Sequence, residues 1–290
     1  MAECTIQDLF GAFQRFWSEA ADLPAGEQVD RWATVYMADH GELLGKQLDN
    51  YAAMGGDWRR VATERVFSDL AGRMDAMNIA RTNLLEVLPA TYRQSVDLLG
   101  FDCPVLFVIY VGIGCGAGWA TELAGGPAVL HGLEKIAECG WIDRPSLTSL
   151  AAHELGHVAH FHWRHLAGKA HGDGAFWDLY TEGFAQRCEH SVQGRDSWHQ
   201  SKGVNPPGWT RWCADHLPWL AAEFLRRTEA RQPVNVFFGD WFQLRGWKQC
   251  GYFLGHEFIR AMAQELSLSD IALLDDWEPR LHKWLSRIAQ

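Results

Sequence analysis

The run His153-Glu154-Leu155-Gly156-His157 constrains this chain more than any other feature of its sequence. Its two histidines are four positions apart, which on an α-helix places both imidazoles on one face, about one turn apart. Two ring nitrogens at that separation can bind one tetrahedral metal ion. Glu154 projects about 100° round the helix from His153, so it can overhang the ion without binding it, where a general base belongs. The run therefore predicts a helix that carries a metal site.

The flanking sequence predicts the helix that this site requires. The run Asp143-Arg144-Pro145-Ser146 is typical of a helix start, and Gly168 is typical of a helix end. We therefore expect a helix from Pro145 to about Leu166. A second helix should begin near Asp173, a candidate N-cap, and contain Glu182.

The rest of the chain predicts an α+β fold. Residues 1–98 show apolar positions at helical spacing, whereas Pro104–Val111 and Ala128–Leu133 are typical of strands and flank the glycine-rich segment Gly112–Gly126. We predict a mostly helical protein, with a small mixed or antiparallel sheet packed on the motif helix and a helical C-terminal region. The expected organisation is a helical N-terminal region over 1–98 and a metallohydrolase domain over 99–290, or one continuous domain.

Charge and cysteine usage narrow the partners and the compartment. The formal net charge is −10 and no basic stripe is present, so nucleic acid is not expected as a partner. The most apolar stretch, Pro104–Gly112, is too short to span a membrane as a helix. The 7 cysteines are scattered and never spaced as CxxC, which argues against a disulfide framework and a thiolate zinc site. We expect the reducing cytoplasm and no membrane partner.

A catalytic zinc ion needs a third protein ligand and an open position. One known pattern adds a glycine and a third histidine after the motif, but those places hold His160 and Trp163. A second pattern takes a glutamate from the following helix, and Glu182, which lies 182 − 157 = 25 positions after His157, fits it. We predict Zn²⁺ held by His153, His157 and Glu182. The weaker rivals for the third ligand are Asp173 and Glu189.

The pairing of His153-Glu-Leu-Gly-His157 with Glu182-Gly-Phe-Ala185 resembles the gluzincin clan of zinc metallopeptidases, which includes thermolysin-like proteases and neutral zinc aminopeptidases. The likeness is greatest to a little-studied family of predicted zinc-dependent proteases. That family also has a glycine-rich strand region upstream and a late Gly-Tyr-x-x-Gly element, here Gly251–Gly255. The resemblance covers roughly residues 100 to 265 and implies a zincin-like fold that hydrolyses peptides.

The resemblance also implies roles for further residues. Tyr252 should support the developing oxyanion, with His256 as the alternative. The strand region around Gly116 and Trp119 should form a substrate rim by edge pairing. His160 lies too far along the helix axis to share the ion, so we assign it to the cleft wall or to a place behind the ligands.

One position departs from the family pattern. Relatives often carry an acidic residue four positions after the glutamate ligand, next to a metal-binding histidine, and this chain has Gln186 there. A glutamine carbonyl can accept the imidazole N–H, but it is neutral and raises the basicity of the ligand less. Either metal binding is weaker here or another carboxylate takes this role.

The sequence thus predicts a zinc-dependent hydrolase, and the resemblance makes it a peptidase in which Glu154 takes a proton from water and passes it to the leaving amine. One alternative is a zinc hydrolase or lyase that acts on a small amide in a biosynthetic pathway. A narrow aromatic pocket would favour that reading. Another alternative is a non-catalytic protein with a structural zinc ion and a helical partner-binding region, for which a fourth protein ligand would be needed.

Overall fold

The computed structural model describes residues 3–290, and 64% of the structure is helical. With its single small mixed sheet, this confirms the predicted α+β fold. The chain divides into two compact units, the first formed by Met1–Ala90 and Asp102–Thr148 and the second by Thr91–Phe101 and Ser149–Gln290. These units do not test the predicted domain boundary between residues 98 and 99, which stays a prediction.

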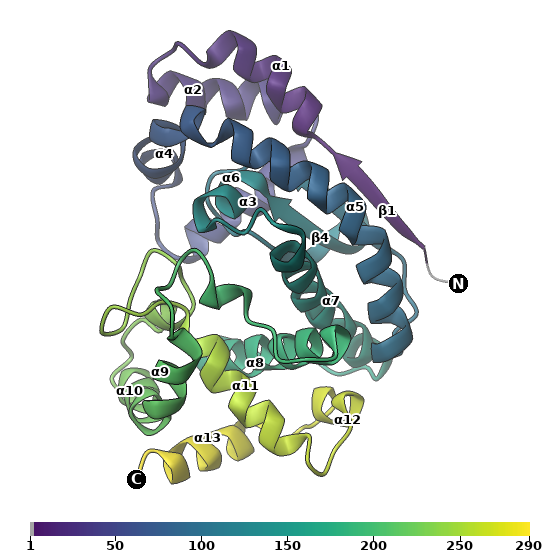
Figure 1. The fold of residues 1–290 in the computed structure, drawn as a ribbon, viewed down its shortest axis with the longest axis vertical. Helices are drawn as coiled ribbons and strands as arrows, with labels where there is room; N and C mark the ends of the chain where they lie inside the picture. The colour runs from purple at the N-terminus through teal and green to yellow at the C-terminus, as the bar shows by residue number, and fades with distance from the viewer. Residues whose placement is uncertain (1–2) are drawn as a thin grey trace. The chain divides into compact units, whose positions relative to one another are not determined.

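The first unit contains all the strands of the sheet and the N-terminal helices (Figure 1). The strands are β1 (Cys4–Asp8), β2 (Val105–Tyr110), β3 (Trp119–Leu123) and β4 (Gly126–Gly132). The α-helices are α1 (Phe10–Ala20), α2 (Ala25–Arg31), α3 (Gly41–Ala53), α4 (Trp58–Val61), α6 (Leu133–Cys139), most of α5 (Met74–Leu99) and the first turn of α7 (Arg144–Leu166). Short π-helical turns cover Trp32–Tyr36 and Ala62–Val66, and 3₁₀ turns cover Phe67–Asp69 and Ala71–Arg73.

The sheet has the strand order β1-β2-β4-β3. Strands β1, β2 and β4 run parallel, whereas β3 pairs antiparallel with β4 and forms an edge. The prediction of helix throughout residues 1–98 is wrong at Cys4–Asp8, which pairs in parallel with β2 from Val105 to Ile109. Five alternating residues carry little signal alone, and their partner strand lies about a hundred positions later, so local pattern could not reveal the pairing. Strand β3 lies inside the glycine-rich segment, in the strand region that the resemblance implies around Gly116 and Trp119.

The glycine-rich segment after β2 is held by buried side chains. The Glu134 carboxylate accepts hydrogen bonds from the backbone N–H groups of Gly112 and Gly114, at 2.7 and 3.1 Å. Tyr51 donates its hydroxyl to the carbonyl of Ile113 at 2.7 Å. A Cβ at Gly112 would lie 2.7 Å from Oε1 of Gln47. Glycine is therefore required there by close approach of side chains to the backbone.

Strand β4 carries a histidine that should make the first unit sensitive to acid. His131 is fully buried, and burial lowers its pKa to about 4. An unfolded histidine has a pKa of about 6.5, so below that pH the unfolded chain takes up a proton that the folded chain does not. Stability should therefore fall as the pH falls from 6.5, by about 2 kcal/mol at pH 5.

Urea unfolding at pH 7 and pH 5 tests this expectation. A His131→Phe variant keeps an aromatic ring against Phe107, whose centroid lies 6.1 Å from that of the imidazole. The variant should lose about 2 kcal/mol less than the wild type between the two pH values. Equal losses would show that His131 does not resist protonation in the fold.

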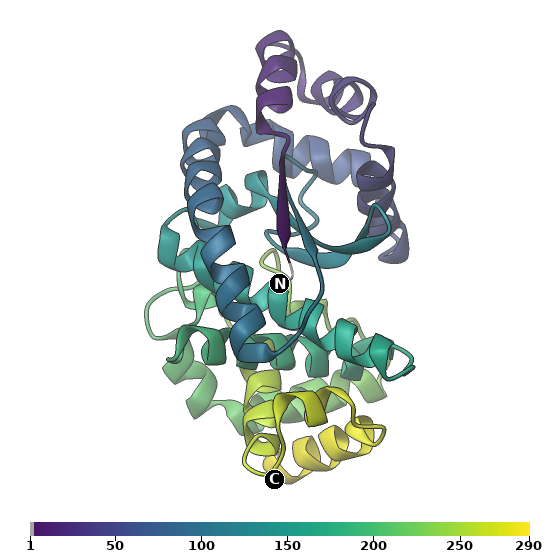
Figure 2. The same cartoon turned by 90° about the vertical axis from the view of Figure 1, so that its right-hand side faces the viewer.

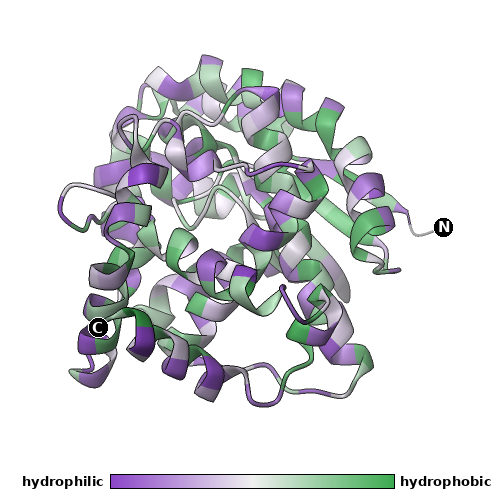
Figure 3. Cartoon of the chain, turned by 60° about the horizontal axis from the view of Figure 1, so that its bottom comes forward, coloured by the Kyte–Doolittle hydropathy of each residue, from purple (hydrophilic) through white to green (hydrophobic). Residues whose placement is uncertain are grey.

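The second unit is built from helices. They are the rest of α7, then α8 (Gly174–Gln193), α9 (Trp209–Asp215), α10 (Leu217–Glu229), α11 (Cys250–Met262), α12 (Leu268–Ala272) and α13 (Trp277–Ile288), with 3₁₀ turns at His199–Ser201 and Asn235–Phe237. Helices α12 and α13 pack on α8, α13 also lies along α10, and their yellow ribbons sit together in Figure 2. Hydrophilic and hydrophobic residues alternate along the helices in Figure 3. Within residues 3–290, no helix has the length and apolar character needed to cross a membrane.

Candidate metal centre

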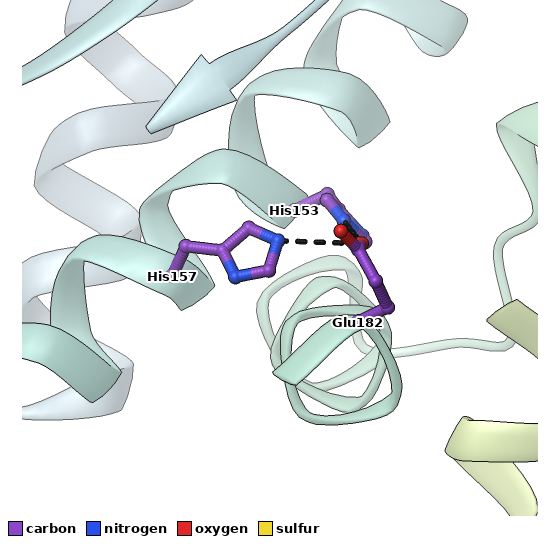
Figure 4. A group of neighbouring side chains, drawn as sticks. All are labelled: His153, His157 and Glu182. Carbon is purple, nitrogen blue, oxygen red and sulfur yellow. Dashed lines mark hydrogen bonds and ion pairs between the residues drawn. The ribbon is translucent and has the colours of Figure 1, made fainter. Parts of the chain in front are cut away.

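Helices α7 and α8 bring three potential metal ligands together (Figure 4). Oε2 of Glu182 lies 3.1 Å from Nε2 of His153 and 3.4 Å from Nε2 of His157. One ligand atom from each residue lies within 4.8 Å of the other two. Both histidines are buried, and the Glu182 side chain is 25% exposed. The predicted helix from Pro145 to Leu166 and the predicted start of α8 at Asp173 are confirmed.

Gly156, inside the motif, lets α7 and α8 approach closely. A Cβ at this position would lie 2.7 Å from Cβ of Cys188 and 2.9 Å from Cα of Ala185. Real Cβ atoms do not come so near to another helix, so any larger residue would push α8 away. Glu182 is positioned by the same contact, because it lies one turn before Ala185 on α8.

A second glycine contact joins α8 to α11. A Cβ at Gly183 would lie 2.6 Å from Cα of Gly255, and a Cβ at Gly255 would lie 2.9 Å from Cα of Gly183. The two helices therefore cross with their backbones in contact. Tyr252, less than one turn before Gly255, lies with its ring centroid 5.5 Å from that of His153. The motifs Glu182–Ala185 and Gly251–Gly255 thus each supply one glycine to the same contact between α8 and α11.

The two glutamates near the histidines have opposite pKa shifts. Burial acts to raise the pKa of Glu182, but hydrogen bonds and charge from His157 and His153 outweigh it and hold the pKa far below its usual range. Glu154 is 6% exposed, and its burial raises its pKa, opposed by the neighbouring His153 and His157. The Glu182 carboxylate is therefore ionised, and Glu154 next to it holds a proton more readily than an exposed glutamate.

The donor set fits zinc. Two imidazole nitrogens and one carboxylate oxygen are ligands that Zn²⁺ accepts, and three protein ligands are the number in catalytic zinc sites. Both histidines direct Nε2 at one oxygen of Glu182, at 3.1 and 3.4 Å, which is close to the separation of two ligand atoms that each lie about 2.1 Å from one tetrahedral Zn²⁺. Asp173, considered as a rival ligand, is exposed at the N-cap of α8, and the described residues that could hold an ion together are His153, His157 and Glu182.

The two residues predicted to support an oxyanion lie in different surroundings. The Tyr252 ring is next to His153. His256 is 2% exposed, and its ring lies 4.4 Å from that of His190 and 5.0 Å from that of Trp198. Its Nδ1 is 3.2 Å from the Glu257 carboxylate. The geometry brings Tyr252, and not His256, into contact with the cluster.

His160 is fully buried among aromatic side chains. Its ring centroid is 4.9 Å from that of Phe184 and 5.4 Å from that of Trp177. Burial lowers its pKa well below the usual range, so the imidazole is neutral. Neither ring nitrogen has a hydrogen-bond partner among residues 3–290, so His160 makes no hydrogen bond to a proposed ligand, and the predicted role as cleft wall or support stays a prediction.

Glu189 and His199 form a polar network next to His153. The sequence had suggested Glu189 only as a rival metal ligand and had not suggested His199. Glu189 is fully buried on α8, and its Oε2 lies 3.8 Å from Nδ1 of His153 and 3.1 Å from Nδ1 of His199. Burial acts to raise the pKa of Glu189, but His199, His153 and Ser197 outweigh it and lower the pKa. The signal available in the sequence was spacing, since Glu189 follows Glu182 by two helical turns.

Gln186 does not take the place expected for it. Its carbonyl oxygen accepts a hydrogen bond from Nε2 of Gln200 at 2.8 Å. Its amide nitrogen donates to Glu189 and to the carbonyl of Ser197, both at 2.9 Å. Gln186 therefore supports Glu189, where the family pattern expects a direct contact with a histidine.

Gly116 and Trp119 belong to the first unit, where Gly116 precedes the edge strand β3 and Trp119 is its first residue. A Cβ at Gly116 would lie 2.9 Å from the carbonyl oxygen of Gly118, so a tight turn accounts for this glycine. Their place at a substrate rim stays a prediction.

Comparison of the chain with protein-family models, with curated proteins and with solved structures gave no match.

Proposed function

We propose that this protein is a zinc-dependent hydrolase and that its substrates are peptides. The observation that carries the proposal is the convergence of His153, His157 and Glu182, with Glu154 buried next to the first of them. Two histidines, a carboxylate from the next helix and an adjacent glutamate are the parts that zinc hydrolases use. The resemblance to gluzincins supports the same reaction.

The chain's own residues divide the chemistry among them. Zinc, when bound by His153, His157 and Glu182, would polarise a water molecule and the carbonyl of the substrate. Glu154 removes the proton of the attacking water and transfers it to the leaving amine. Tyr252, beside His153, donates its hydroxyl to the oxygen on which negative charge develops.

The choice of a peptide as substrate rests on the resemblance of the two motifs, His153–His157 and Glu182–Ala185, to those of gluzincin peptidases. We also propose the cytoplasm as compartment, because 5 of the 7 cysteines are buried thiols and such cysteines suit reducing conditions.

Metal analysis tests the site. The purified wild-type protein should contain about one zinc ion per chain, whereas His153→Ala, His157→Ala and Glu182→Ala should each retain less than about a tenth of that, because two ligands hold zinc weakly. His165→Ala is the matched control, since it removes an exposed histidine from the same helix. Full zinc content in all three ligand variants would overturn the assignment.

Activity tests the choice of substrate. Zinc-loaded wild-type protein, incubated with a pool of quenched fluorescent peptides, should cleave some of them. A chelator should stop the cleavage and added zinc should restore it. A zinc-loaded protein that cleaves no peptide would refute the peptidase assignment while leaving the metal site intact.

A further inference from the structure

The buried carboxylate of Glu189 is the strongest feature of the second unit that the proposed reaction does not use. Its Oε1 accepts a hydrogen bond from the Ser197 hydroxyl, and its Oε2 accepts from Gln186 and lies 3.1 Å from Nδ1 of His199. A buried carboxylate is costly unless donors surround it. Gln186 and Ser197 supply such donors and hold the Glu189 carboxylate in one place.

The nearest proposed metal ligand to this carboxylate is His153. Its Nε2 faces Glu182 at 3.1 Å, on the side of the metal cluster. Its Nδ1 is buried and has no hydrogen-bond partner within residues 3–290, and Oε2 of Glu189 lies 3.8 Å away. An imidazole that binds a metal through one nitrogen carries its proton on the other, and leaving that N–H buried and unpaired is unfavourable.

The orientation of Gln186 leaves Glu189 as the residue of α8 whose carboxylate faces Nδ1 of His153. Its amide nitrogen faces two acceptors, Glu189 and the Ser197 carbonyl, and its oxygen faces the Gln200 amide nitrogen. A flipped amide would oppose acceptor to acceptor and donor to donor, so the network fixes this orientation. The side chain of Gln186 is thus engaged in holding Glu189, one turn farther along α8.

We infer that Glu189 is a positioning residue that keeps the proton of His153 on Nδ1 and so presents Nε2 to the metal. Gln186 and Ser197 hold the Glu189 carboxylate in place for this task. The inference rests on the proposed metal site. In the resembled family an acidic residue four positions after the glutamate ligand lies next to a metal-binding histidine. Here the acidic residue lies seven positions after Glu182, 189 − 182 = 7.

Zinc affinity, measured by competition with a chromophoric chelator, tests the inference without any assay of turnover. Glu189→Gln keeps the size of the side chain and removes its charge, and it should weaken zinc binding about 10- to 100-fold. Glu257→Gln is the matched control, because it removes a carboxylate from His256, which is not a ligand. The control should bind zinc within about twofold of the wild type.

A double variant tests whether the position of the carboxylate, and not only its presence in the network, determines zinc affinity. Gln186→Glu combined with Glu189→Gln keeps one carboxylate and one amide in the same buried network, one turn apart from their present places. Its zinc affinity should stay as low as that of Glu189→Gln, because the charge no longer faces His153. Wild-type affinity in either variant would overturn the inference.

Nuclear magnetic resonance of the zinc-loaded protein, with ¹⁵N-labelled histidine, observes the proton on Nδ1 of His153 directly. Zinc binding through Nε2 alone would already place a proton there, so the decisive comparison is its exchange with solvent, which should be slower in the wild type than in Glu189→Gln. Equal exchange in the two proteins would refute the inference while leaving zinc binding intact. A wild-type protein that binds no zinc would instead refute the proposed function.

Discussion

A Glu154→Gln variant should keep its zinc and lose turnover by about a hundred- to ten-thousandfold. Glutamine has the shape of glutamate, so the 6% exposed site should remain packed as it is. The amide cannot take a proton from water, which removes the general base while leaving His153, His157 and Glu182 intact. The measurement is kcat on a peptide from the pool, together with zinc per chain.

Glu223→Gln provides a comparison, since it makes the same chemical change on α10, where the carboxylate pairs with Arg226 and Arg227. Its turnover should equal that of the wild type. Retained turnover in Glu154→Gln would remove Glu154 as the base. Loss of zinc from that variant would instead make Glu154 a ligand.

Gly183→Ala should lower the free energy of unfolding by about 3 kcal/mol, at the upper end of overpacking effects. The added Cβ would meet the backbone of Gly255, at 2.6 Å from its Cα, and a backbone cannot move aside as a flexible side chain can. Helices α8 and α11 would have to separate, which would displace Glu182 and Tyr252 from His153. Thermal unfolding and zinc content should therefore fall together.

Gly45→Ala shows what the same substitution does where there is space. Gly45 lies in α3, and nothing is within 4 Å of its added Cβ. Alanine forms helix better than glycine, so this variant should gain up to about 1 kcal/mol. If Gly183→Ala were equally stable, α8 and α11 could not cross with their backbones in contact.

The sequence allowed good prediction of the helices that carry the proposed ligands and poorer prediction of the sheet. The start of α7 and the N-cap of α8 followed from Pro145 and Asp173, because residue types at helix ends are selected by the local backbone conformation. Strand β1 was missed because its identity depends on pairing with β2. A strand becomes recognisable through its neighbours, and these can lie anywhere in the chain.

The proximity of the proposed ligands His153 and His157 could be predicted from helical geometry alone, since residues four positions apart on a helix share one face. Glu182 is a different case, because only the approach of α8 at Gly156 puts its carboxylate 3.1 Å from His153. The network behind His153 depends still more on tertiary structure. The family resemblance pointed to Gln186, whereas the buried neighbours of α8 turn Gln186 toward Gln200 and leave the carboxylate of Glu189 facing His153. Side chains that share a helix face can be read from periodicity, but burial and hydrogen-bond partners from other segments decide which of them meets a ligand.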